Sequence, residues 1–146
     1  MTVDTLAGAG RVFVDTSVLV YVYDNDEPHK QQVASQALAE VGAERVVLSA
    51  QVLNEFVVTV TRKLARPLDD ARTREAVEVL GQLEVVPVDA GLVAAGVLRS
   101  QGSQLSLWDA LVVEAARRGS CEVLLTEDLH PGTDFDGVRV VNPFAG

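Results

Sequence analysis

Short apolar runs alternate with longer stretches of helical periodicity along this chain. The runs have the length and composition of strands buried on both faces, and they cover 12–14, 45–49, 83–86, 122–126 and 138–141. Between them, apolar residues recur at helical spacing over 17–23, 29–41, 51–64, 69–80, 89–100 and 107–118. The alternation predicts an α/β fold with a central parallel sheet of about five strands and helices on both of its faces.

The length and composition fit one folded domain. The 146 residues are 48% hydrophobic and 23% charged, which is ordinary for a globular protein and argues against disorder. We expect residues 11–146 to form the domain. Residues 1–10 lack the basic start and apolar core of a signal peptide, and we interpret them as a loose leader. No apolar run is long enough to cross a bilayer, so we expect no membrane contact and a cytoplasmic location.

Charge and cysteine content restrict the function. The formal net charge of −9 argues against a non-specific coat on nucleic acid, but acids that gather around bound cations would still permit a specific, metal-dependent contact. Cys121 is the only cysteine, so no disulfide can form within the chain. With only two histidines besides, a zinc site is disfavoured and a hard-metal site of oxygen ligands stays open.

The first apolar run ends on a carboxylate, at a position typical of a ligand-binding residue. Asp15 follows the run 12–14 directly, and ligands of open α/β sheets bind beyond the carboxyl ends of the strands. Thr16 or Ser17 would cap the helix that follows. A tight turn or a helix start would explain Asp15 equally well.

Asp128 repeats this layout at the end of a later run. It follows the run 122–126, whose last residue is the hydroxyl-bearing Thr126. If this strand neighbours the first one, the two carboxyl ends form a crevice and both acids face it. A role in a turn is the alternative for Asp128.

Two further acids lie on predicted helices. Glu55 points away from the apolar stripe of the helix 51–64, so it is either a solvated surface residue or a side chain turned toward a site. Asp109 comes three residues after Ser106, which matches the spacing of a capping box, although Glu or Gln is usual there. Helix capping and metal binding are equally compatible with Asp109.

Together these fragments resemble the PIN domain, and within that family the VapC toxins of type II toxin–antitoxin systems. The resemblance runs from residue 11 onward, with all the motif fragments in order and at separations similar to those of the family. The fragments are Phe13–Leu19, Ser49–Phe56, Ser106–Leu111, and Leu125–Leu129 followed by Val140–Phe144.

The resemblance implies an α/β/α sandwich and an endoribonuclease that depends on Mg²⁺ or Mn²⁺. By the motif match, the four catalytic and metal-binding acids of the family fall on Asp15, Glu55, Asp109 and Asp128, and the supporting hydroxyls fall on Thr16, Ser17 and Thr126. It also implies a cognate antitoxin protein that lies across helices 29–41 and 51–64, a homodimer, and an RNA substrate. Carboxylates suit a hard cation, and a divalent ion lowers the pKa of the attacking water and binds the phosphate oxygen.

Three other classes of protein have acids at strand ends. A receiver domain needs a lysine near the end of a late strand, and this chain has none after Lys63. A phosphohydrolase with an aspartyl nucleophile needs a second Asp two residues after the first, where this chain has Ser17. A catalytically silent PIN-like binding module would usually lack one of the four acids. We therefore favour the ribonuclease and keep the silent module and other phosphoryl-chemistry domains as alternatives.

A basic segment follows the acidic helix. Arg62 is seven residues after Glu55 and falls on the same face of a continuous helix, as does Thr59. Arg66 would also fall there if the helix continued, but Pro67 makes that uncertain. Arg62 and Arg66 are accordingly candidates for binding an RNA phosphate beyond the scissile one, and a solvated basic edge is the alternative.

Overall fold

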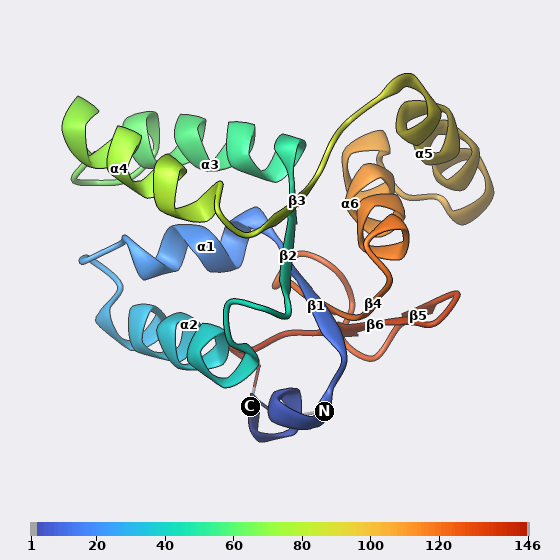
Figure 1. Cartoon of the computed structure of the whole chain (residues 1–146), viewed down its shortest axis with the longest axis horizontal. Coiled ribbons are helices and arrows are strands. Elements are labelled where there is room, and N and C mark those ends of the chain that lie inside the picture. The colour runs from blue at the N-terminus through green and yellow to red at the C-terminus, as the bar shows by residue number, and fades with distance from the viewer. Residues whose placement is uncertain (1–2, 146) are drawn as a thin grey trace.

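Strands and helices alternate through residues 3–145, the part of the chain that this computed structural model describes (Figure 1). The strands are β1 (Arg11–Val14), β2 (Val46–Ser49), β3 (Glu84–Val86), β4 (Cys121–Leu125), β5 (Asp134–Phe135) and β6 (Val138–Val141). The helices are the 3-10 helix η1 (Val3–Gly8), α1 (Thr16–Val22), α2 (Pro28–Val41), α3 (Ala50–Arg62), α4 (Asp70–Leu80), α5 (Ala90–Ser103) and α6 (Leu107–Arg118).

The strands form a single sheet in the order β3-β2-β1-β4-β6-β5, and every neighbouring pair is parallel except β5 and β6. Phe13 pairs with Leu124 and Val14 with Leu125, so β1 and β4 end level with each other. The residues that follow these two strands therefore lie side by side, at the edge of the sheet where α/β proteins bind their ligands.

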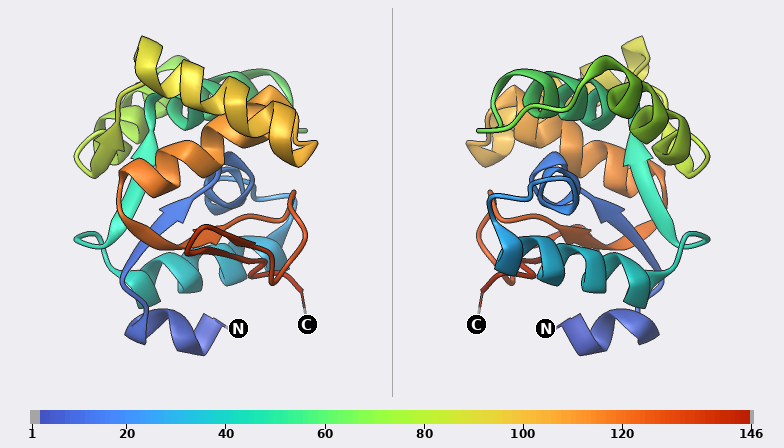
Figure 2. Two further views of the ribbon diagram at one scale, coloured as in Figure 1. Left: turned by 90° about the vertical axis from the view of Figure 1, so that its right-hand side faces the viewer. Right: turned by 90° about the vertical axis from the view of Figure 1, so that its left-hand side faces the viewer.

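Helices cover both faces of the sheet, as the alternation predicts. Both views in Figure 2 show α6 on one side of the central strands and α2 on the other. Helix α3 packs on α1 and α4, and α5 packs on the outside of α6. The strand residues Val12, Phe13 and Leu124 are fully buried between these layers, which explains why the strands are apolar without alternation. None of the helices in residues 3–145 has the length and apolar character needed to cross a membrane.

The sandwich architecture and all five predicted strands are confirmed, and a sixth strand was missed. Strand β5 forms a hairpin with β6 through Asp136 and Gly137, whose φ values are 54° and 99°. Asp-Gly is a strong sequence signal for such a two-residue turn, because both positions require positive φ. The two residues of β5 are too few to form an apolar run, so the sequence predicts only a connection here.

The described part of the leader differs from the expected loose segment. Residues Val3–Gly8 form η1, which packs against α2 (Figure 2), and Leu6 is fully buried. Arg45, just before β2, donates hydrogen bonds from Nη1 to the carbonyl of Leu6 at 3.1 Å and to that of Ala9. The segment is therefore fixed to the domain by one buried leucine and one arginine. Residues 1–2 lie outside the described part of the chain.

Candidate active site

Asp15 lies at the end of β1 and is almost completely buried, with 5% of its surface exposed. Its Oδ1 accepts a hydrogen bond of 2.7 Å from the backbone N–H of Thr16, and Asp15 is itself the N-cap of α1. The prediction that Thr16 or Ser17 caps this helix is therefore wrong. Asp15 thus starts helix α1 and also lies at the carboxyl end of β1, where ligands of such sheets bind. A role at the helix start therefore does not exclude a role in ligand binding.

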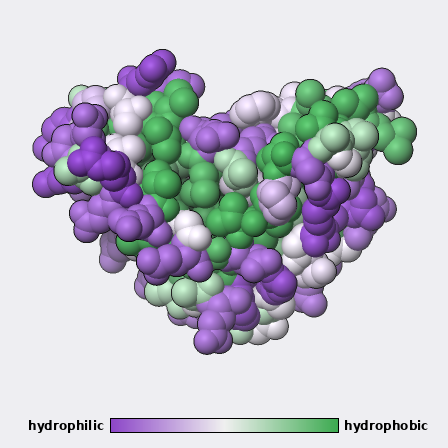
Figure 3. Space-filling view, turned by 45° about the horizontal axis from the view of Figure 1, so that its top comes forward, coloured by the Kyte–Doolittle hydropathy of each residue, from purple (hydrophilic) through white to green (hydrophobic). Residues whose placement is uncertain are grey.

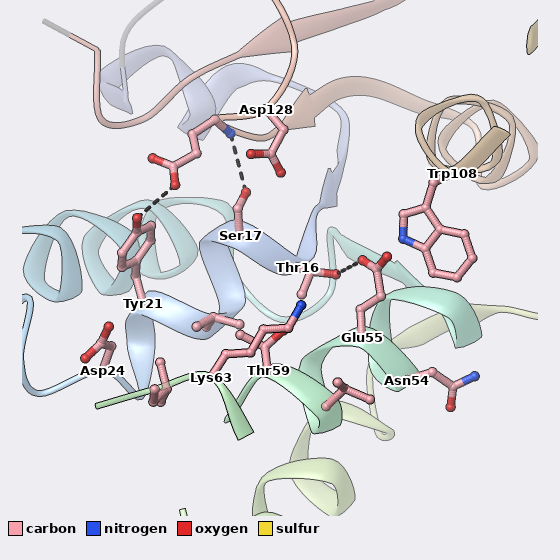
Figure 4. A pocket seen from close by; sticks show the side chains of 14 residues that line it. Thr16, Ser17, Tyr21, Asp24, Asn54, Glu55, Thr59, Lys63, Trp108 and Asp128 are labelled. Atoms are coloured by element: carbon pink, nitrogen blue, oxygen red, sulfur yellow. Dashed lines mark hydrogen bonds between the residues drawn. The ribbon is translucent and has the colours of Figure 1, made fainter. Parts of the chain in front are cut away.

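Thr126 connects the ends of the two central strands. Its hydroxyl donates a hydrogen bond of 2.8 Å to Oδ2 of Asp15 and accepts one of 3.1 Å from the backbone N–H of Asp128. Ser17 joins the same loop from the other side, because its Oγ accepts a bond of 3.4 Å from the backbone N–H of Glu127 (Figure 4). Thr126 thus holds the Asp15 carboxylate, and Thr126 and Ser17 together hold the backbone of the loop that carries Glu127 and Asp128.

Glu55 is turned toward this loop rather than toward solvent. It is half-buried on α3, and its Oε2 accepts a hydrogen bond of 2.9 Å from the hydroxyl of Thr16. The apolar residues of α3, including Val52, Phe56 and Val60, pack into the core, so Glu55 projects from a different face of the helix. This contact connects α3 to the first turn of α1 and fixes the orientation of the carboxylate.

Asp109 occupies the third position of α6, where a capping box would place it. Ser106 caps the helix by accepting a hydrogen bond of 3.0 Å from the backbone N–H of Asp109. The reciprocal bond, from the backbone N–H of Ser106 to the Asp109 carboxylate, is absent among residues 3–145. Capping thus occupies the backbone of Asp109 and leaves its carboxylate available.

A cleft of about 720 Å³ lies over these residues. Figure 4 shows Glu55 and Asp128 on its walls, with Trp108 and Lys63 at different sides of it. Thr16 and Ser17 also line it, whereas the buried Asp15 does not. On the whole molecule, the surface in Figure 3 is hollowed between the side formed by α3 and α4 and the side formed by α5 and α6. Of the four predicted acids, Glu55 and Asp128 line the cleft, whereas Asp15 and Asp109 lie outside its lining but within electrostatic reach of these two.

The acids raise one another's pKa values. Burial is the largest cause of the raised pKa of Asp15, which reaches about 6, and the negative charges of Asp128 and Glu55 raise it further against the hydrogen bonds from Thr126 and Thr16. Burial also raises the pKa of Glu55 and that of Asp128, and the Asp109 charge adds to both. Each acid thus lies within the electrostatic reach of another, and the cleft carries an excess of negative charge.

This donor set fits a hard divalent cation better than a soft one. Carboxylate and hydroxyl oxygens line the cleft, as Mg²⁺ and Mn²⁺ prefer. Burial and, to a smaller extent, the neighbouring negative charges raise the pKa values of Asp15 and Glu55, and a bound cation would relieve the repulsion between these charges. Within residues 3–145, no three acidic, His or Cys side chains converge closely enough to be a ready-made metal cage. The predicted set Asp15, Glu55, Asp109 and Asp128 accordingly remains open around the cleft, and its role as a set of metal ligands stays a prediction.

The basic residues after Glu55 are arranged differently from a continuous helix. Helix α3 ends at Arg62, which is exposed and is not part of the cleft lining. Arg66 forms an ion pair of 2.9 Å with Asp26. Lys63, the C-cap residue of α3, does line the cleft, and its charge lowers the pKa of Glu55 against the raising effect of burial. The RNA-binding roles of Arg62 and Arg66 stay predictions, and Lys63 is a cleft residue that sequence periodicity missed.

A cluster of side chains that joins the cleft residues Tyr21 and Glu127 to Lys30 and Phe144 was also missed. Glu127 accepts hydrogen bonds from the hydroxyl of Tyr21 at 2.8 Å and from the ammonium of Lys30 at 3.2 Å. Lys30 also lies over the rings of Tyr21 and Phe144, with 4.8 Å and 5.4 Å between its Nζ and the ring centroids. This cluster holds the residue next to Asp128 by its side chain. No sequence spacing indicates it, because its members come from α1, α2 and the two loops near the carboxyl terminus.

Comparison with known proteins agrees with this architecture. Three solved structures superpose on most of the chain. A toxin–antitoxin complex from Klebsiella pneumoniae matches with a TM-score of 0.69 and 20% identity over 91% of this chain and 98% of the other. VapC20 from Mycobacterium tuberculosis is described as a toxin that cleaves the sarcin-ricin loop. It matches with a TM-score of 0.60 and 20% identity over 77% of this chain and 86% of the other. DNA-bound VapBC from Salmonella typhimurium matches with a TM-score of 0.58 and 19% identity over 90% of this chain and 97% of the other.

At these identities the superpositions establish the fold alone. No curated protein sequence matches the chain. The family model of the PIN domain, however, matches residues 12–133, which include β1, the acidic helix α3, the start of α6 and the loop after β4. That match spans all four predicted acids and most of the sheet. The chain therefore belongs to the PIN domain family.

Proposed function

We propose that this protein is a Mg²⁺- or Mn²⁺-dependent endoribonuclease of the VapC type, which acts as the toxin of a toxin–antitoxin pair on RNA in the cytoplasm. The observation that carries the proposal is that four acids from separate parts of the chain lie within electrostatic reach of one another. Glu55 and Asp128 line the cleft, and Asp15 and Asp128 follow the adjoining ends of β1 and β4. The likeness to a toxin that cleaves the sarcin-ricin loop, to a toxin–antitoxin complex and to VapBC supports the choice of substrate and biological role.

A divalent ion held by Asp15, Glu55, Asp109 and Asp128 would supply positive charge to the phosphate and lower the pKa of the attacking water. The protein contributes orientation. Thr126 and the backbone N–H of Thr16 each hold one oxygen of Asp15, so this carboxylate cannot rotate freely. The hydroxyl of Thr16 holds Glu55 in the same way. Such fixed oxygens reduce the reorganisation that a reaction otherwise requires.

An apolar groove supports the proposed antitoxin partner. A hollow of about 310 Å³ lies between α1, α2 and α4, and its lining is aliphatic except for Tyr23. Val79 on its rim is 55% exposed and continues the apolar lining onto the surface, and contiguous exposed apolar surface is typical of an interaction site. We propose that a segment of the antitoxin occupies this groove, in agreement with the predicted contact to helix 29–41. The exposed valines and leucines of α5 (Figure 3, upper right) would serve the proposed homodimer.

The direct test is incubation of the purified, antitoxin-free protein with total RNA, with and without Mg²⁺, followed by mapping of the cut ends. We expect cleavage only with the ion, and 5′-phosphate and 3′-hydroxyl ends, because water attacks phosphorus. Asp15→Asn and Asp109→Asn should abolish cleavage and leave the fold intact. Asp70→Asn is the matched control, since Asp70 is exposed at the start of α4, outside the cleft.

Two outcomes contradict the proposal. Ends with a 2′,3′-cyclic phosphate show attack by the ribose hydroxyl and remove the water mechanism. RNA that stays intact under all metal conditions, while the protein still binds the product of its neighbouring gene, favours the catalytically silent PIN-like binding module.

A further inference from the structure

The cleft contains one aromatic ring and one cation whose positions the acidic chemistry does not explain. Trp108 lies at the start of α6 with 50% of its surface exposed, although tryptophan is usually well covered in a folded protein. Lys63 lies on another side of the same cleft, and Glu55 is on the wall with them (Figure 4). Both side chains face the space that an RNA strand would enter.

Trp108 is held in place from its backbone. Gln51, in the first turn of α3, is buried and donates a hydrogen bond of 3.3 Å from Nε2 to the carbonyl of Trp108. This contact fixes the first turn of α6 against the first turn of α3, the helix that carries Glu55. The backbone of Trp108 therefore has a defined position relative to the helix that carries Glu55, while its ring stays half-exposed on the cleft. A fixed and exposed ring is the usual platform on which an unpaired base stacks.

Lys63 is the cation of the cleft that has no partner. Among residues 3–145, it is the only basic side chain in the cleft lining and it forms no salt bridge. The neighbouring basic residues differ in this respect, because Lys30 pairs with Glu127 and Arg66 with Asp26. Lys63 acts electrostatically on Glu55, so its ammonium lies near the acids. An ammonium in this position suits a phosphate oxygen.

We infer that the cleft binds an unpaired segment of RNA, with a base stacked on the Trp108 ring and an adjacent phosphate on Lys63, so that the bond between them lies over Glu55 and Asp128. This inference rests on the proposed nuclease function and names the form of its substrate. A net charge of −9 repels RNA, so the binding energy has to come from stacking as well as from charge. A base in a continuous duplex cannot offer its face to an aromatic ring, and single-stranded loops can.

Trp108 is the only tryptophan of the chain, so its fluorescence reports on this position alone. Binding is measured in the presence of a chelator, which prevents metal-dependent cleavage, with a short oligoribonucleotide that has no self-complementarity. We expect this strand to quench the emission of Trp108 in a saturable way. The same sequence as a duplex, or with abasic sites in place of the bases, should bind more weakly and quench much less.

Variants separate the two contacts. Trp108→Leu should weaken binding of the single strand about 5- to 100-fold, the usual effect of losing one stacked base, and Trp108→Phe should recover most of it. Lys63→Gln should weaken binding and reduce the slope of log affinity against log salt by about one unit, while saturating RNA still quenches Trp108. Arg74→Gln, which removes an exposed charge on α4 away from the cleft, is the control and should bind as the wild type does.

Three outcomes overturn the inference. One is Trp108 emission that does not respond to single-stranded RNA, and another is a duplex that quenches it equally. The third is a shift of Trp108 emission with protein concentration in the absence of RNA, which means that a second copy covers the ring. A parallel cleavage assay with Mg²⁺ keeps the two proposals apart: cleavage without quenching refutes only the base platform, and quenching without cleavage refutes only the nuclease.

Discussion

Thr126 donates a hydrogen bond of 2.8 Å to Oδ2 of Asp15, and this bond joins residues 111 positions apart at the ends of β4 and β1. Both side chains are buried, so water cannot easily take the place of either partner, and loss of the hydrogen bond would leave a buried polar atom without a partner. The bond lowers the pKa of Asp15 against the larger effect of burial, and it therefore favours the charged carboxylate that a cation requires.

Thr126→Val should disturb both stability and metal affinity. The substitution keeps the shape of the side chain and leaves Oδ2 of Asp15 without its donor, which should lower the free energy of unfolding by about 1–3 kcal/mol. It should also weaken Mg²⁺ binding at neutral pH, because the pKa of Asp15 rises further. Urea denaturation and a Mg²⁺ titration followed by thermal shift measure the two effects, and Thr126→Ser is the conservative control. If Thr126→Val has the wild-type free energy of unfolding and the wild-type Mg²⁺ affinity, the bond contributes neither to stability nor to metal binding.

The metal-free protein should become less stable as the pH rises from about 4 to about 6. The pKa of Asp15 in the folded protein is about 6, above the ordinary 3.8, so the folded state binds a proton more tightly than the unfolded state does. Stability from this group is complete below the ordinary pKa and is lost as the pH passes through 6. The raised pKa values of Glu55 and Asp128 act in the same direction.

The loss from Asp15 alone is on the order of 2–3 kcal/mol, since one pKa unit corresponds to about 1.4 kcal/mol. Chemical denaturation at several pH values in a chelator measures it, and Asp15→Asn should flatten the dependence. Saturating Mg²⁺ should reverse the slope, because protons and the cation compete for the same oxygens. An unfolding free energy that rises steadily from pH 4 to pH 7 in the metal-free wild type would contradict the assignment.

Lys30 should support the reaction through charge on Glu127 rather than by touching RNA. Lys30→Met leaves Glu127 as one more uncompensated negative charge beside Asp128, so the cleavage rate and RNA affinity should each fall several-fold. Glu127→Gln in the same chain removes that excess and should restore most of the loss. A double variant that is no better than Lys30→Met would indicate a direct contact of Lys30 with the substrate.

The apolar groove between α1, α2 and α4 should be needed for the antitoxin and not for catalysis. Val79→Asp places a charge on its exposed rim, and it should abolish the stable complex expected from co-expression with the neighbouring open reading frame. RNA cleavage by the isolated variant should stay at the wild-type rate. Val88→Asp is the matched control, because Val88 is 38% exposed and lies outside the groove. A complex that survives Val79→Asp would move the partner to another surface.

The arrangement of strands and acids could be predicted because it depends on local patterns. Each acid follows a recognisable boundary: Asp15 and Asp128 come after apolar runs, and Asp109 begins a helix. Glu55 could be placed because α3 is regular as far as that residue, so its angle to the apolar stripe is fixed by 3.6 residues per turn.

The basic side of the cleft could not be predicted in this way. Helical geometry pointed to Arg62, which lies on the same helix as Glu55 but is not part of the cleft lining, whereas Lys63, the C-cap residue of that helix, is. The direction of a side chain beyond a helix end depends on the following loop, which periodicity does not describe. The cluster of Tyr21, Lys30 and Glu127 is similarly invisible, because it depends on how α2 and the loop after β4 pack against α1.

The central position of β1 has a consequence for how the protein is made. One edge of β1 stays unpaired until β4 has been synthesised, 111 residues after it, which takes roughly 5 to 20 seconds at ordinary elongation rates. Until then Asp15 has no Thr126, and the loop that carries Asp128 does not exist. A chain that stops at Gly119 should therefore be inert toward RNA, and addition of residues 120–146 as a separate peptide is the measurement that checks this. Under the proposed nuclease function, translation that stops before β4 would release inactive fragments, and activity could arise only after β4 and the loop with Asp128 have been made.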